Sequence, residues 1–323
     1  MEVNLRWVPV TAVAPVAWGA TYFVTHRFLP ADYPLYGGAI RALPAGLLLL
    51  LVRRAIPRGS WWWRSLLLGT LNVGVFFALI YLAAQVLPTS VASTIMATSP
   101  VAMMLIAWAI LAERPRAAHL AGAGIGIGGV CLMLLDGTAA IAYSGVLASV
   151  AAMAMSALGY VLAKRWGTGI DVFSLTSWQL IAGGVILLPV AAVVEGAPPT
   201  LDRPAIFGFG YVTVVATALA FAAWFTGLRH LSAGTVGLIG LLNPLTGVLL
   251  GAVIAGERLA PQQICGVVLV FVGILLGQPV AERLVGRARD QSETRSAVTV
   301  RACGPPRRTR RSPPRRSRPD ATG

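Results

Sequence analysis

One arginine, Arg41, lies some seven residues inside an otherwise apolar stretch, with no acidic residue within one helical turn. A charge inside a membrane costs several kcal/mol unless it is paired, hydrated or able to reach the interface. Two interpretations stay open for Arg41. It contacts a carboxylate-bearing substrate or a gate partner, or it has a structural role in which it binds backbone carbonyl groups or snorkels outward.

Two prolines precede two Glu-Arg pairs by the same interval. Pro100 lies 13 residues before Glu113 and Pro244 lies 13 residues before Glu257, which is about 20 Å along a helix. A proline inside a helix removes one backbone hydrogen bond and frees a carbonyl group. Interrupted helices at matching places indicate a site at the membrane midplane, with plain packing kinks as the alternative. The pathway positions predicted here are Thr98, Pro100, Asn243 and Pro244.

The two Glu-Arg pairs lie at the ends of predicted helices, where a catalytic role has no support. We expect Glu113-Arg114 and Glu257-Arg258 to form interfacial ion pairs or loop latches. The alternative is a gate that breaks when a central cavity changes sides.

Aromatic and amide side chains inside apolar segments complete the candidate substrate pathway. Each of them could instead be a packing or interface residue. Tyr22 aligns with Tyr160, and Arg41 aligns with Gln179, when the two halves of the chain are compared. The predicted set is Trp18, Tyr22, Asn72, Tyr81, Tyr160, Trp178, Gln179 and Trp224.

Several chemistries lack the residues that they need. The sequence has no Asp-rich cluster for a metal-diphosphate transferase and no Walker motif for ATP. None of its 12 acidic residues falls inside an apolar segment, whereas proton or sodium relays usually need buried carboxylates. We therefore predict no enzyme activity, no cofactor and no metal site, and we expect a facilitator or exchanger.

The composition indicates an integral membrane protein. Of 323 residues, 56% are hydrophobic and 12% are charged, whereas soluble proteins carry about 25% charged residues. The net charge of +14 suggests nucleic-acid binding at first. Much of this charge lies after Gln278 and in short loops, and membrane topology explains that distribution better.

Ten apolar segments are long enough, some only just, to cross about 30 Å of hydrocarbon. Each must be a helix, because lipid offers backbone groups no hydrogen-bond partners. The predicted spans are residues 7–26, 35–52, 65–84, 90–112, 119–135, 143–163, 172–193, 204–226, 233–255 and 261–277.

The chain contains one five-segment pattern twice. A shift of 144 positions places Pro100 on Pro244 and Glu113 on Glu257, and a shift of 138 aligns the earlier part of each half. Because five is odd, the second copy must cross the membrane in the opposite sense. The short loops hold ten Lys and Arg residues on the face of the N-terminus and three on the other face. Both termini are therefore predicted to be cytoplasmic.

Residues 278–323 differ from the rest of the chain in being rich in Arg, Pro, Ser and Thr. Such a segment cannot bury enough apolar surface to fold, so we predict a disordered basic cytoplasmic tail. Anionic lipid is a candidate partner of this tail. The predicted divisions are 1–138 for the first repeat, 139–277 for the second and 278–323 for the tail.

Five glycines lie close together in the fifth segment: Gly122, Gly124, Gly126, Gly128 and Gly129. They form overlapping patterns of small residues four apart, which let membrane helices approach closely. No Lys-Ser/Thr follows them, so a phosphate-binding loop is excluded. Close packing against the tenth segment, or a homodimer contact, accounts for them.

The sequence resembles the EamA-type transporters of the drug/metabolite transporter superfamily over residues 7–277. The residues that carry the likeness are Ala17-Trp18-Gly19, Arg41, Pro100 with Glu113-Arg114, Asn243-Pro244 with Gly256-Glu257-Arg258-Leu259, and Gly266 to Gly277. The resemblance implies ten helices in two inverted halves, a central cavity, and export or exchange of small metabolites such as amino acids. Ser99 departs from the pattern, because Asn243 stands at this place in the second half.

We therefore predict an all-α integral membrane fold of ten transmembrane helices in two inverted five-helix repeats. The predicted function is secondary transport of small metabolites, amino acids or related compounds, across the plasma membrane, with export favoured. The alternative is a lipid or metabolite flippase, or a receptor-like membrane protein, on the same fold.

Overall fold

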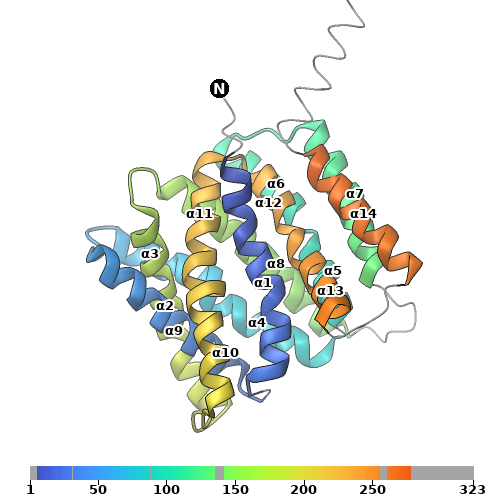
Figure 1. Cartoon of the computed structure of the whole chain (residues 1–323). Coiled ribbons are helices and arrows are strands. Elements are labelled where there is room, and N and C mark those ends of the chain that lie inside the picture. The colour runs from blue at the N-terminus through green and yellow to red at the C-terminus, as the bar shows by residue number, and fades with distance from the viewer. Residues whose placement is uncertain (1–5, 31, 88, 135–141, 255–259, 278–323) are drawn as a thin grey trace, which may run out of the picture. The chain divides into compact units, whose positions relative to one another are not determined.

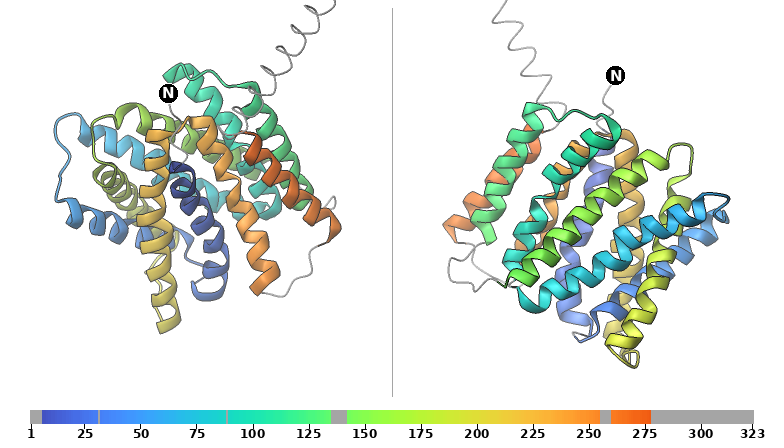
Figure 2. Two further views of the ribbon diagram at one scale, coloured as in Figure 1. Left: turned by 45° about the horizontal axis from the view of Figure 1, so that its top comes forward. Right: turned by 180° about the vertical axis from the view of Figure 1, so that it is seen from behind.

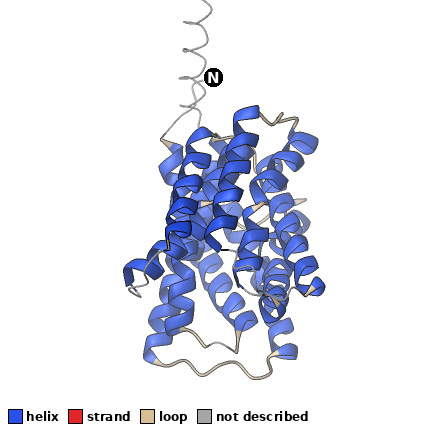
Figure 3. Ribbon diagram, turned by 90° about the vertical axis from the view of Figure 1, so that its right-hand side faces the viewer, coloured by secondary structure: helices blue, strands red, loops and turns tan. Residues whose placement is uncertain are grey.

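All secondary structure among the described residues is helical (Figures 1 and 3). The computed structural model describes residues 6–30, 32–87, 89–134, 142–254 and 260–277. The first half forms α1 (Trp7–Phe28), α2 (Pro34–Arg53), α3 (Trp61–Gly69), η1 (Thr70–Gly74), α4 (Val75–Val86), α5 (Thr89–Ala97), α6 (Ser99–Leu111) and α7 (Ala117–Leu134). The second half forms α8 (Tyr143–Trp166), α9 (Val172–Val194), α10 (Arg203–Thr213), η2 (Val214–Leu219), α11 (Ala220–His230), α12 (Ala233–Gly240), α13 (Leu242–Ile254) and α14 (Pro261–Leu276).

These helices confirm the predicted all-helical membrane fold. Within the described ranges, 8 helical stretches are long and apolar enough to cross a membrane, and Ser99–Leu111 and Pro261–Leu276 are shorter apolar helices. Large apolar side chains point outward along them, with Val193 86% and Phe207 80% exposed. In a bilayer such side chains contact lipid.

Corresponding helices of the two halves are interrupted at corresponding places. The fourth segment breaks at Thr98, between α5 and α6, and the ninth breaks at Leu241, between α12 and α13. Pro100 and Pro244 each lie in the first turn of the helix that follows the break. A proline is tolerated there, because the N–H that it lacks would have no helical partner.

The third and eighth segments each contain a π-helical turn that the sequence did not reveal. The turns are η1 and η2, and the 144-residue shift places the start of one, Thr70, on the start of the other, Val214. A π-helical turn widens the helix and often marks a functional position. The two halves therefore share a backbone irregularity as well as a pattern of apolar residues.

Two pairs of corresponding helices pack directly against each other and run antiparallel. A Cβ atom on Gly122 of α7 would lie 2.5 Å from Gly273 O of α14, and one on Gly129 would lie 2.7 Å from Gly266 O. The α2–α9 pair behaves alike, since Gly46 faces Ile181 and Gly184 faces Leu43. Corresponding helices that pack antiparallel are what an inverted repeat with a twofold axis in the membrane plane requires.

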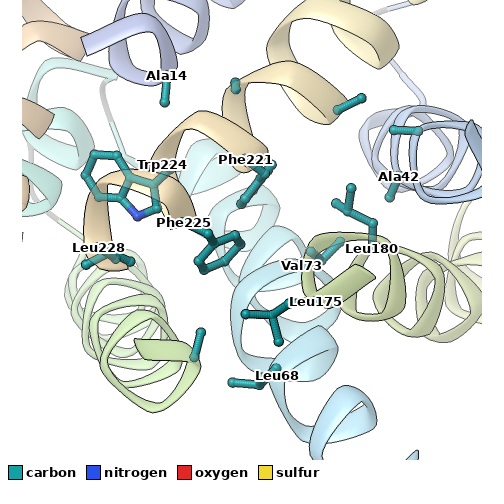
Figure 4. Packing of buried hydrophobic residues seen from close by; sticks show 14 of the residues in the cluster. Ala14, Ala42, Leu68, Val73, Leu175, Leu180, Phe221, Trp224, Phe225 and Leu228 are labelled. Carbon is teal, nitrogen blue, oxygen red and sulfur yellow. The ribbon is translucent and has the colours of Figure 1, made fainter. Parts of the chain in front are cut away.

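The remaining packing follows the same twofold relation. Helix α1 packs against α11 and α13 of the second half, and its counterpart α8 packs against α4 and α6 of the first half (Figure 2). The main cluster of buried apolar side chains lies where α1, α2, α3, α9 and α11 meet, with Trp224, Phe221 and Phe225 among its largest members (Figure 4). The interface between the halves therefore contributes much of the core.

Candidate functional site

Arg41 of α2 forms hydrogen bonds with the π-helical turn η2 of the other half. Its Nε donates to Thr217 Oγ1 at 2.8 Å and its Nη2 donates to Ala216 O at 3.1 Å. The guanidinium carbon lies 5.2 Å from the centroid of the Phe77 ring. The hydrogen bonds and the ring therefore offset part of the cost of the charge. One of the two acceptors, Ala216 O, is a backbone carbonyl oxygen of the kind that the structural interpretation expects, and the other is a hydroxyl group.

Thr217 shows how η2 accommodates the arginine. Its Oγ1 donates to Val212 O at 2.6 Å, five residues earlier, and so acts as acceptor for Arg41 Nε. Ala216 O also accepts from Trp18 Nε1 at 3.0 Å, so one carbonyl oxygen takes donors from α1 and α2. The π-helical turn therefore presents polar atoms that a regular helix would use internally.

Trp18 is one of four aromatic rings that contact one another across the interface between the halves. The Trp18 ring lies 5.2 Å from Phe221 and 5.3 Å from Trp224, and Tyr160 of α8 lies 5.4 Å from Trp224. Trp224 Nε1 is buried and has no hydrogen-bond partner among the described residues. The site thus combines a cation with an aromatic wall that carries an unused donor.

The equivalent place in the first half holds neutral side chains that are buried. Asn72 of η1 donates from Nδ2 to Gln179 Oε1 at 2.8 Å, and the two residues are only 1% and 2% exposed. The repeat sets Gln179 at the position of Arg41 and Ala216 at that of Asn72. The amide of Asn72 lies against Gly159 of α8, where a Cβ atom would overlap it. Asn72 Oδ1 and Gln179 Nε2 have no partner in the described part of the chain.

The other predicted pathway residues have varied surroundings. Thr98 Oγ1 donates to Ile95 O at 2.7 Å, and buried Pro100 packs against Gly237 at the α5–α6 break. Asn243 follows the corresponding break and has a buried Oδ1 without a partner within the described ranges. Pro244 lies beside it in α13. The breaks therefore carry polar atoms in both halves.

Trp178 and Tyr81 have other surroundings in the structure. Trp178 donates from Nε1 to Ala55 O at 2.8 Å, and its ring lies 5.6 Å from that of Trp61 at an interplanar angle of 53°, so it anchors the α2–α3 loop. Tyr81 is half-buried against the main core cluster. The side chain of Tyr22 lies outside the described residues.

Glu113 forms a latch with two other segments at the end of the bundle where α1 begins. Its Oε1 lies 2.5 Å from Lys164 Nζ at the end of α8, and its Oε2 accepts from Ala233 N at 3.0 Å at the start of α12. Lys164 Nζ also donates to Leu231 O at 2.8 Å. The pair is partly shielded, with side-chain exposures of 16% for Lys164 and 29% for Glu113.

The sequence identified only one member of this latch. Arg114, predicted as part of the same gate, is exposed in the structure. Glu257 and Arg258, the predicted equivalents in the second half, lie outside the described residues. From the sequence, Lys164 is one of the ten basic residues of the short loops that set the topology. Its position directly after the predicted span 143–163 was the one available sign of a partner.

Comparison with known proteins places this geometry in a family. The EamA-like transporter family matches residues 5–135 and 143–277, one match in each half. Protein PecM of Dickeya dadantii (strain 3937) is 36% identical over 270 residues, covering 83% of this chain and 91% of PecM. A probable amino-acid metabolite efflux pump of Salmonella typhimurium is 28% identical over 280 residues, covering 81% and 91%.

A solved crystal structure shares the fold, with a TM-score of 0.75 at 17% identity over 86% of this chain and 98% of the other. An uncharacterized inner membrane transporter, YedA of Escherichia coli (strain K12), is 26% identical over 270 residues, covering 81% of this chain and 87% of YedA. The two family matches coincide with the two inverted halves, whose antiparallel helices enclose the aromatic and polar groups described above. The chain is therefore a multi-pass membrane transporter, not an enzyme, and belongs to the EamA-like transporter family.

Proposed function

We propose that this transporter exports small metabolites, amino acids or related compounds, across the plasma membrane by alternating access. A relative named as a probable amino-acid metabolite efflux pump supports the substrate class, and a relative named as an inner membrane transporter supports the location. The observation that carries the mechanism is the latch of Glu113, Lys164 and Ala233. It ties three segments together at one end of the bundle.

Inverted halves explain how such a latch serves transport. Two halves of similar structure and opposite orientation can exchange conformations, so a site between them opens first to one side and then to the other. The latch joins α6 of the first half to α8 and α12 of the second. It therefore restrains the two halves relative to each other at one end, which is where a gate must act.

The latch end is assigned to the cytoplasm. Trp7 stacks on His230 at 3.9 Å, which places the start of α1 beside the end of α11 at this end. Most Lys and Arg residues of the short loops lie on the same side, and such residues favour the cytoplasmic face. In this assignment the structure has its cytoplasmic gate closed, because the latch is formed.

The substrate path is assigned to the group around Arg41 and the aromatic wall. Trp224 Nε1 and Asn243 Oδ1 are buried polar atoms without described partners. A buried donor or acceptor left unpaired costs about 1–3 kcal/mol, which a polar substrate would recover. In this assignment Arg41 supports η2 and adds positive potential, so an anionic group on the substrate is favoured.

Loss of the Glu113 charge tests the gate. Glu113→Gln can still accept from Ala233 N but loses the ion pair with Lys164, so the cytoplasmic end should open more often. A cysteine at Thr98, in a chain whose natural cysteines are replaced, should then react faster with an impermeant maleimide from the latch side. The matched control is Asp171→Asn, which removes the exposed ion pair to Arg53 at 2.7 Å. Unchanged labelling and transport in Glu113→Gln would refute the gate.

Orientation and coupling need separate measurements. Cysteines replacing Arg116 and Arg203 should react with impermeant reagent from the cytoplasm and from outside, respectively, and reaction on the same face would refute the inverted arrangement.

In liposomes, export of a metabolite found outside overproducing cells should follow its own gradient. Strict dependence on an imposed pH gradient would overturn the facilitator or exchanger mechanism.

Two partners are proposed in addition to the substrate. The arginines after Gln278 would contact anionic lipid, and a homodimer contact is proposed through the outward face of α7, where Gly124 and Gly128 have no atom within 4 Å of an added Cβ. Deletion of residues 279–323 should leave transport intact, and loss of transport would favour a receptor-like role for the tail.

A further inference from the structure

A small apolar groove lies between the last turns of α1 and the first turns of α10. Its volume is about 190 Å³, and it is lined by Val24, Phe28, Phe207, Gly208 and Tyr211. Sites that enclose a whole small molecule measure about 300–1,000 Å³. The groove is thus suited to part of a molecule, such as a segment of a hydrocarbon chain.

Gly208 gives the groove its floor. A Cβ atom at this position would lie 2.9 Å from Phe28 Cβ and 2.9 Å from Leu29 Cδ2, so the glycine allows α10 to approach α1 there. The two helices lie side by side at the lower end of Figure 1. Rings from both helices form the rim, since Phe207 is 80% exposed and Phe28 is 39% exposed. In a membrane protein this rim faces lipid, so the occupant comes from the bilayer.

Two arginines lie next to the lining residues at the same end of the bundle. Arg27 precedes Phe28, Arg203 lies one turn before Phe207, and both are exposed. Their positions near the end of α1 and at the start of α10 correspond to the headgroup level of a bilayer. Guanidinium groups bind phosphate oxygens through paired hydrogen bonds.

The acidic residues at this end are mostly engaged elsewhere. Asp202 Oδ1 accepts from Ala205 N at 2.8 Å at the start of α10. Both carboxylate oxygens of Glu195 accept from backbone N–H groups at the start of α2. Asp32 is exposed. Asp202 and Glu195 therefore bond to backbone N–H groups and do not pair with the two guanidinium groups.

We propose that this groove is a binding site for one anionic phospholipid of the surrounding bilayer. One acyl chain lies in the groove between α1 and α10, and Arg27 and Arg203 hold the phosphate. The site also reaches the transport machinery. Tyr211 forms one wall, and its hydroxyl donates to Ala17 O at 3.3 Å, next to Trp18. Lipid bound here would stabilise the contact between α1 and the η2 segment.

Native mass spectrometry of the full-length, delipidated protein tests the proposal. Phosphatidylglycerol and phosphatidylcholine of identical chains are added in separate titrations, and we expect one tightly held phosphatidylglycerol. The double variant Arg27→Gln, Arg203→Gln should bind it about 30-fold more weakly, given the usual contribution of an arginine near anionic lipid. The matched control is Arg229→Gln, which removes an exposed arginine at the other end of the bundle and should bind as the wild type does.

A second variant tests the groove itself. Val24→Trp should fill it and abolish tight binding, whereas Val13→Trp, at a 47% exposed position on the same helix, should not. Equal affinity for the two lipids, or tight binding that survives either the double arginine variant or Val24→Trp, would overturn the proposal. These measurements do not depend on transport, so they stand apart from the proposed function.

Discussion

The two π-helical turns show how one backbone feature can serve two chemical purposes. In η2, Ala216 and Thr217 receive the charged Arg41 and the indole of Trp18. In η1, at the equivalent place, Asn72 donates a hydrogen bond to the neutral Gln179, and both side chains are buried. The backbone is repeated in both halves, whereas the side chains that contact it are not.

From this difference we propose that the halves have unequal roles at the centre. A buried neutral amide pair stabilises the contact between α9 and η1 without adding charge. A guanidinium in the same position adds positive potential and remains only partly buried. We therefore propose that the second-half turn lies beside the substrate path and that the first-half turn is its structural counterpart. Changes at η2 should affect transport, and changes at η1 should affect stability.

Loss of the guanidinium should have the largest effect. Arg41→Met keeps the apolar stem and removes both donors to η2, each worth about 1.5–3 kcal/mol as a charged hydrogen bond. Export in proteoliposomes should fall by at least about tenfold, since 1.4 kcal/mol corresponds to one factor of ten. Arg41→Lys should rescue this poorly, because an ammonium group lacks the planar fork. Full activity of Arg41→Met would remove Arg41 from the site.

A methyl group at Gly159 should break the opposite turn. Gly159→Ala places a Cβ atom on the Asn72 amide and should separate it from Gln179. An unpaired buried amide costs about 1–3 kcal/mol, so the protein should unfold at a lower temperature in detergent. Gly37→Ala in α2 is the matched control, because no atom lies within 4 Å of its added Cβ. Equal melting temperatures for both variants would contradict the importance of the amide pair.

A double-mutant cycle should show that Asn72 and Gln179 act as a pair. Each single change to Leu leaves one buried amide without its partner, at about 1–3 kcal/mol. The double change removes both polar groups and should cost less than the sum of the singles. Thermal unfolding measures the stability, and transport should fall less than in Arg41→Met. Additive losses of stability would show that the two amides are independent.

Removal of the Trp18 donor should have the smallest effect. Trp18→Phe loses the bond to Ala216 O, worth about 1 kcal/mol, but that oxygen still accepts from Arg41 Nη2. The loss of melting temperature should be small in the wild type and larger in Arg41→Met, where the oxygen loses both donors. The same loss in both backgrounds would mean that the two donors do not share the oxygen.

Much of the fold could be predicted from the chain because its signals are local. Apolar segment length predicts spans, Pro100 and Pro244 predict interruptions, and the glycines of α7 predict close packing against α14. The structure also shows which of these glycines face a neighbouring helix, which the sequence pattern did not indicate. Gly122, Gly126 and Gly129 have α14 or α12–α13 atoms within 3 Å of an added Cβ, whereas Gly124 and Gly128 have none within 4 Å.

The candidate site was harder to predict, since its partners are far apart in the chain. Arg41 stood out as a lone charge, and backbone carbonyl groups were one expected set of partners. That Arg41 contacts one carbonyl oxygen, of Ala216, together with the hydroxyl group of its neighbour Thr217 could not be foreseen. No residue pattern signals a π-helical turn, and a shift of one residue there changes which carbonyl faces α2.

The sequence by itself determined the apolar spans, their interruptions and their repetition in opposite senses, because these depend on hydropathy, proline chemistry and the parity of five helices. Only the tertiary structure decided that Arg41 meets η2, that Gln179 meets Asn72, and that Glu113 joins Lys164 to the start of α12. Each of these contacts joins separate helices, so their relative positions and rotations must be fixed before any of them exists.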